Sequence, residues 1–70
     1  MYTYKIYLHK EPEGGFTVKV PALPGCITYG EDVDEAIVMA REAIELYIEG
    51  LQERGETIFD ESNILEYSYK

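Results

Sequence analysis

A long amphipathic helix between Asp32 and Gly55 is the feature that most constrains what this chain of 70 residues can fold into. Apolar side chains recur there at spacings of three and four residues, the period that places them along one side of an α-helix. The stripe consists of Val33, Ala36, Ile37, Ala40, Ile44, Tyr47, Ile48 and Leu51. Because such a helix must bury its stripe against another element, the rest of the chain has to supply a matching apolar face.

The ends of this helix are marked by residues with known terminal preferences. Asp32 is a good N-cap residue, and Glu35 three positions later completes a capping-box-like pattern. Gly55 favours termination, since glycine readily adopts the backbone conformation that ends helices. Gly50 lies inside the helix, where glycine costs about 1 kcal/mol relative to alanine. Close approach of a strand would explain that glycine.

The first twenty residues alternate between apolar and polar side chains with the period of a β-strand. The apolar face carries Tyr2, Tyr4, Ile6 and Leu8 in the first segment and Phe16, Val18 and Val20 in the second. Between them, residues 11–15 contain a proline and two glycines. Two strands joined by a short glycine-containing loop predict an antiparallel hairpin.

The sheet is then interrupted at Pro24 and Gly25, which suit the two central positions of a type II turn. A short strand over residues 26–29 follows and ends at Gly30. The length of the connection allows either a hairpin or a corner at this point.

The region after the helix is expected to return to the sheet. Residues 56–63 form a polar loop in this interpretation, with Ile58 and Phe59 against the edge of the core. Residues 64–69 form a final strand, whose inner face would carry Leu65, Tyr67 and Tyr69.

The predicted order of elements is β-β-β-α-β, in one α+β domain that spans residues 1–70. We expect a three-stranded antiparallel meander with the helix packed on one sheet face. A helical crossover permits the C-terminal strand to lie parallel to the first strand. The sheet face without a helix carries Thr3, Lys5, Tyr7, Thr17 and Lys19. That mixture suits water or a second subunit.

Composition narrows the class of partner. The chain has 14 acidic and 6 basic side chains and a formal charge of −8, which repels phosphate backbones and favours a basic protein partner over nucleic acid.

The single cysteine, Cys26, excludes an intrachain disulfide and indicates a reducing, cytoplasmic location. No basic segment leads into an apolar stretch at the N-terminus, which argues against secretion and membrane insertion. Because the core of so short a chain is small, a homo-oligomer (dimer or tetramer) is expected.

No pattern in the sequence predicts catalysis, a metal site or a cofactor. A general base needs an orienting partner and a pocket, so His9 is interpreted as a surface residue. Neither a helix N-terminus nor a nearby cation is evident to activate Cys26, which is interpreted as structural. A two-metal nuclease needs inward carboxylates on its central strand, and residues 2–10 contain no Asp or Glu.

The exposed side of the helix is acidic and carries Glu42, Glu45, Glu49 and Glu53. Like charges one turn apart destabilise a helix by roughly 0.2–0.5 kcal/mol per pair. Two interpretations remain open: a solvated face that maintains solubility, or an electrostatic surface that binds a basic partner.

The stretch from Pro21 to Gly30, followed by an acidic helix start, resembles the HicB-type antitoxin family. The matching motif positions are Pro21, Leu23, Pro24, Gly25, Cys26 and Gly30. Further agreement at residues 45–51 and 55–58 extends the resemblance over nearly the whole chain.

The resemblance implies a partial ribonuclease-H-like domain without the catalytic acids. It also implies a non-catalytic antitoxin role, in which the domain neutralises a small basic HicA-like toxin that cleaves messenger RNA. Full-length members often carry a C-terminal DNA-binding module, which we expect to be absent because the sequence ends at Lys70.

Under this hypothesis, the partner contacts are the four helix glutamates or, by strand addition, an exposed sheet edge. Two other functions remain possible from the sequence. One is a small hydrolase or nuclease that uses His9 or a carboxylate, and the other is a homo-oligomeric structural protein.

Overall fold

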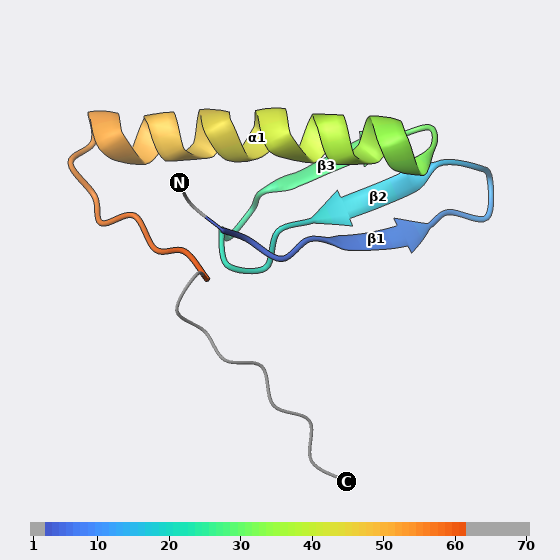
Figure 1. The fold of residues 1–70 in the computed structure, drawn as a ribbon, viewed down its shortest axis with the longest axis horizontal. Helices are drawn as coiled ribbons and strands as arrows, with labels where there is room; N and C mark the ends of the chain where they lie inside the picture. Colours follow the sequence, from blue (N-terminus) through green and yellow to red (C-terminus); the bar gives the residue numbers. More distant parts are fainter. Residues whose placement is uncertain (1–2, 62–70) are drawn as a thin grey trace, which may run out of the picture.

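Three short strands and one long helix make up the regular structure of residues 3–61, the part of the chain that the computed structural model describes. The strands are β1 (Tyr7–Lys10), β2 (Phe16–Lys19) and β3 (Ile27–Gly30), and the helix is α1 (Val33–Glu53). The strands form an antiparallel sheet in the order β1-β2-β3. Figure 1 shows α1 lying across one face of this sheet, which confirms the predicted two-layer α+β arrangement.

The predicted hairpin between the first two strands is confirmed, although regular pairing begins only at Tyr7. Leu8 lies opposite Val18, so both apolar side chains face the helix layer. The turn is closed by hydrogen bonds from the Glu11 N–H to the Gly15 carbonyl and from the Gly14 N–H to the Glu11 carbonyl, both 3.0 Å. These contacts fix the register of the hairpin.

The third strand continues the meander, so the hairpin alternative is correct and the corner alternative is wrong. Lys19 lies opposite Ile27 in the antiparallel pairing of β2 with β3. Within the connection, the Val20 N–H donates to the Cys26 carbonyl at 3.1 Å, and Gly25 has a φ of +81°. A positive φ is the conformation that glycine adopts without a steric penalty.

The predicted ends of the helix are confirmed. The Glu35 N–H donates to the Asp32 carboxylate at 2.8 Å, and the Glu35 carboxylate accepts the N–H of Glu31 at 2.7 Å. The Glu35 carboxylate therefore bonds to the N–H of the residue before the N-cap, and not to the N–H of the N-cap itself as in a standard capping box. After Arg54, Gly55 has a φ of +67° and ends the helix.

The core lies between α1 and the sheet in two adjoining clusters. One contains Val18 with Ala36 and Ala40, and the other contains Val20, Leu23 and Cys26. The small alanines allow the helix to approach the sheet closely. A Cβ at Gly30 would lie only 2.3 Å from the backbone nitrogen of Ala36, so glycine is required there.

The expected burial of the whole helix stripe is only partly correct. Ala36, Ala40 and Leu51 are buried, but Val33 and Ile37 are 46% and 42% exposed. The reason is the placement of α1, which packs on β2 and β3 and leaves its flank toward β1 open.

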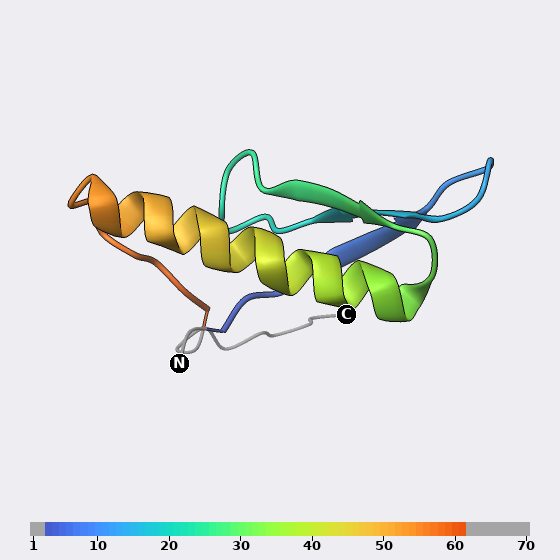
Figure 2. The same ribbon diagram turned by 90° about the horizontal axis from the view of Figure 1, so that it is seen from above.

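The segment after the helix returns to the N-terminal segment, as Figures 1 and 2 show. The Glu61 N–H donates to the Thr3 carbonyl at 2.7 Å, and the Thr3 N–H donates to the Asp60 carboxylate at 3.0 Å. The Lys5 N–H donates to the Glu61 carboxylate at 2.7 Å. These bonds hold the two ends of the described chain together.

The expectation for Phe59 is wrong, whereas Ile58 is half-buried as predicted. The ring of Phe59 is 55% exposed, because this residue is held by its carbonyl, which accepts the Tyr4 hydroxyl at 2.6 Å. The final strand predicted over residues 64–69 lies outside the described residues.

Candidate protein-interaction site

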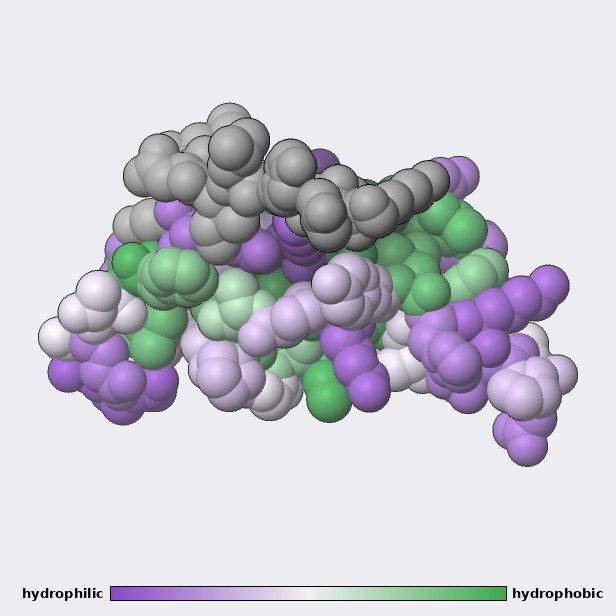
Figure 3. All heavy atoms as spheres, turned by 90° about the horizontal axis from the view of Figure 1, so that it is seen from below, coloured by the Kyte–Doolittle hydropathy of each residue, from purple (hydrophilic) through white to green (hydrophobic). Residues whose placement is uncertain are grey.

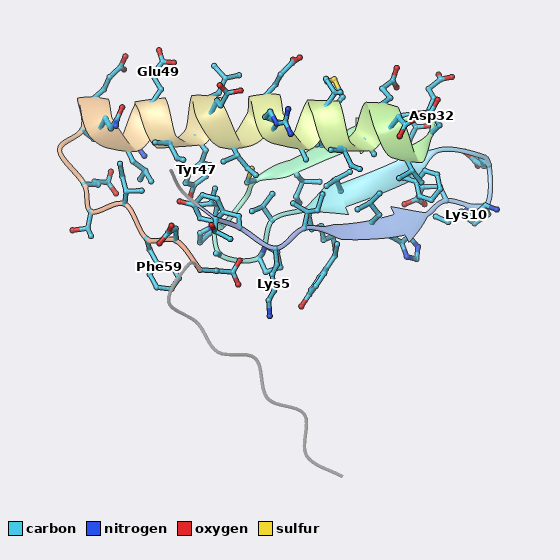
Figure 4. The ribbon with its side chains drawn as sticks, viewed as in Figure 1. Lys5, Lys10, Asp32, Tyr47, Glu49 and Phe59 are labelled. Carbon is cyan, nitrogen blue, oxygen red and sulfur yellow. The ribbon has the colours of Figure 1, made fainter. Side chains whose placement is uncertain are left out.

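The outer side of α1 carries the acidic row that the sequence predicted. Glu42, Glu45, Glu49 and Glu53 are all exposed. Figure 4 shows the side chain of Glu49 pointing away from the sheet. The packing of the stripe beneath the helix turns these carboxylates outward, where they present negative charge to solvent.

Exposed apolar side chains interrupt this acidic surface. Leu46 is 69% exposed and Val38 is 51% exposed. Sequence reasoning missed Leu46 as a surface feature, although its position outside the apolar stripe was the available signal. An exposed leucine among carboxylates gives the helix face an apolar contact point as well as charge.

A groove of about 660 Å³ lies along the other flank of α1. The helix contributes Ile37, Ile44 and Ile48, and the segment before β1 contributes Tyr4 and Ile6. This groove explains why Ile37 remains exposed. Figure 3 views the molecule from the opposite side, the outer face of the sheet, where hydrophobic side chains lie between hydrophilic ones.

The outer face of the sheet is chemically different from the helix face. Tyr7, Lys19 and Ile27 lie side by side across the three strands. A second row follows, formed by His9, Thr17 and Tyr29. Tyr7, Ile27 and Tyr29 are 61%, 58% and 47% exposed, and the two rows contain no carboxylate. Figure 4 shows Lys5 pointing away from the helix on the same side.

The residues considered for catalysis are dispersed in the structure. His9 is exposed on the outer sheet face, while Cys26 is only 6% exposed beside Val20 and Leu23. Burial raises the pKa of the Cys26 thiol above its ordinary value, which disfavours the nucleophilic thiolate. Among residues 3–61, no group of three His, Cys, Asp or Glu side chains is placed to hold a metal ion.

The six motif positions of the resemblance serve the fold. Leu23, Cys26 and Gly30 are buried, while Pro21, Pro24 and Gly25 lie on the exposed part of the turn. The Tyr47 hydroxyl donates to the carbonyl of Pro24 at 2.8 Å and ties this turn to the helix. The turn and the helix are therefore linked directly by this hydrogen bond.

These features define a small α+β domain whose prominent surfaces are an acidic helix face, an apolar groove and a sheet face whose strand positions carry tyrosine, lysine, histidine, threonine and isoleucine. Residues 4–70 match the family described as the HicB-like antitoxin of bacterial toxin-antitoxin systems. The chain belongs to this family, which confirms the resemblance seen in the sequence.

Solved structures and sequence relatives agree with this assignment. The N-terminal domain of the Burkholderia pseudomallei antitoxin HicB is 41% identical and superimposes with a TM-score of 0.70, over 77% of this chain and 64% of that one. A second structure of that antitoxin is 40% identical, with a TM-score of 0.74 over 83% of this chain and 44% of that one. The chain therefore spans less than half of the latter protein.

Two UPF0150 proteins of archaea are also similar. One from Thermoplasma acidophilum is 44% identical over 55 residues, covering 79% of this chain and 80% of its own length. One from Archaeoglobus fulgidus is 46% identical over 46 residues, covering 66% and 67%. In the described part of the chain, α1 is too polar to cross a membrane.

Proposed function

We propose that this chain is a non-catalytic antitoxin domain that binds a small basic HicA-like toxin and occludes its mRNA-cleaving site. The observation that carries the proposal is the row of outward carboxylates Glu42, Glu45, Glu49 and Glu53 on a member of an antitoxin family. A toxin that cleaves RNA needs a cationic surface for the phosphates, and such a surface is complementary to this helix face.

Binding of this kind inhibits by competition. Carboxylates on α1 take the place of RNA phosphates on the toxin, so that one antitoxin domain blocks one toxin. Long-range attraction between a chain of charge −8 and a cationic partner accelerates association, and added salt weakens that attraction. Because the proposed partner cleaves messenger RNA, the proposed function is cytoplasmic. The acidic chain itself is not expected to bind nucleic acid.

We propose that the chain is non-catalytic because its first strand segment contains no acidic residue. A ribonuclease-H-like metal site requires an acidic residue there, and residues 3–10 contain none. We therefore expect no nuclease activity with Mg²⁺ or Mn²⁺. Activity that disappears in His9→Ala would instead support the small-hydrolase alternative.

The proposal includes a fourth strand and a homo-oligomer, either a dimer or a tetramer. Residues 64–69 would pair parallel to the first strand, since the bond from Glu61 to Thr3 already brings the chain beside the N-terminal segment. The outer sheet face supplies the interface between copies, because it exposes Tyr7 and Ile27 and the two rows across its strands contain no Asp or Glu.

Co-expression with a HicA-like toxin tests the function. We expect relief of toxin-induced growth arrest and co-purification of a complex that forms more slowly as salt is raised. A toxin that remains active, and that does not co-purify even at low salt, would contradict the proposal.

A further inference from the structure

Leu46 and Gly50 lie one turn apart on α1, outside the stripe that packs on the sheet. Leu46 has the largest exposed fraction, 69%, among the large hydrophobic residues that are exposed in residues 3–61. A Cβ at Gly50 would meet only the Nη1 atom of Arg54, at 3.3 Å, so the close approach of a strand expected from the sequence is wrong for the described residues. Packing within residues 3–61 therefore does not account for the glycine.

The charges around this pair also oppose the stability of an isolated helix. Glu49 and Glu53 lie near the C-terminal end of α1, where the helix dipole favours cations, and the last turn contains no basic residue. Arg54, which follows the helix, forms its ion pair with Glu56. Local choices that weaken a helix without an internal gain tend to coincide with functional surfaces.

We propose that Leu46 and Gly50 form the anchor of the toxin-binding surface. The side chain of Leu46 enters an apolar pocket of the cationic partner, and a segment of that partner approaches the helix backbone where Gly50 has no side chain. Glu42, Glu49 and Glu53 surround this anchor and contact basic side chains. The inference rests on the proposed function and deepens it by naming where the toxin docks.

Charge identifies the occupant of this surface. A second copy of the chain carries a charge of −8 and would bring further carboxylates against Glu49 and Glu53. A basic protein satisfies them instead. An exposed leucine within a charged rim is also the arrangement of a binding hot spot, in which an apolar anchor is shielded from water by polar contacts.

The decisive variant is Gly50→Ala, because the anchor predicts opposite effects on stability and on binding. Alanine favours the helix, so the Tm of the free chain should rise by about 5 °C. The added methyl group obstructs the partner, so the Kd for an inactive variant of a HicA-like toxin should weaken about tenfold. Leu46→Ala should weaken the same Kd about thirtyfold.

Val38→Ala is the matched control, since Val38 is 51% exposed on the same helix but lies two turns before Leu46. We expect its Kd to stay within about twofold of the unmodified chain. Calorimetric titration supplies the Kd values and thermal unfolding supplies the Tm values.

The outcomes separate the anchor from the proposed function. If the unmodified chain binds the toxin but Gly50→Ala and Leu46→Ala bind it equally well, the anchor is wrong and the antitoxin function stands. If the unmodified chain does not bind the toxin at any salt concentration, both proposals are wrong.

Discussion

The outer face of α1 and the outer face of the sheet belong to the same small domain but have opposite chemistry. The helix face presents Glu42, Glu45, Glu49 and Glu53, whereas the rows across the sheet contain lysine, histidine and tyrosine without any carboxylate. Charge is therefore segregated between two layers. The helix face suits a cationic partner recognised at long range, and the sheet face suits a surface recognised by short-range apolar contact.

The two faces depend on one close contact between the layers, and breaking it has the largest expected effect. Gly30→Ala places a methyl group against the backbone of Ala36, which can move only if the helix shifts. We expect a loss of about 3 kcal/mol in the free energy of unfolding, a large part of the total for a chain of this size. Urea unfolding monitored by circular dichroism measures this loss.

The matched control for that substitution is Gly50→Ala, which adds the same methyl group on the exposed side of α1. Its stability should rise slightly. Equal stabilities for the two alanine variants would show that the layers do not approach each other as closely as the structure indicates.

Removing the charge of the helix face has the next largest effect. Replacing the four helix glutamates by glutamine should slow association with the toxin about a hundredfold at low salt, because electrostatic steering is lost. The same change removes repulsion between like charges along the helix, so the free chain should become slightly more stable. Stopped-flow association at several salt concentrations measures the rate.

The sheet face provides the control for this comparison. Lys5→Gln combined with Lys19→Gln alters charge on the opposite side of the domain and should change the association rate by less than about threefold. Because this variant is more negative than the unmodified chain, a marked rise in its association rate would mean that net charge, and not the helix face, directs the partner.

The sheet face itself is tested by its effect on self-association. Tyr7→Ser with Ile27→Ser removes two exposed apolar side chains that lie in one row across the strands. We expect the dissociation constant of the homo-oligomer to weaken about tenfold, as measured by analytical ultracentrifugation, with toxin affinity unchanged. A monomeric unmodified chain, or an oligomer that is unaffected, would assign the sheet face to solvent.

Sequence reasoning was most accurate where local chemistry determines structure. Asp32 and Gly55 indicated the helix ends because a side-chain cap and a positive φ are properties of single residues. It was less accurate for burial. Ile37 has the helical spacing of a core residue, and Phe59 has a large apolar side chain. Both are nevertheless exposed, because the burial of a side chain depends on which element packs against it.

The candidate site shows the same division. The acidic row follows from helical periodicity alone, so its outward orientation was predictable from the spacing of the glutamates. The position of Leu46 outside the apolar stripe indicated exposure, but how far its side chain is exposed depends on α1 packing through Ala36 and Ala40. Likewise, only the three-dimensional surroundings show that none of the three described strands requires Gly50.

Substitutions at the N-cap residue of α1, Asp32, have the smallest expected effect on stability, and they test whether stability and toxin binding can be changed separately. Asp32→Ala removes the acceptor for the Glu35 N–H and should lower the free energy of unfolding by about 1 kcal/mol. Asp32→Asn keeps an acceptor oxygen and should lose less than half as much. Because the cap lies more than three turns before Leu46, both variants should bind the toxin as tightly as the unmodified chain under conditions in which they are folded. A weaker Kd for Asp32→Ala that Asp32→Asn restores would place the start of the helix, as well as its acidic half, in contact with the partner.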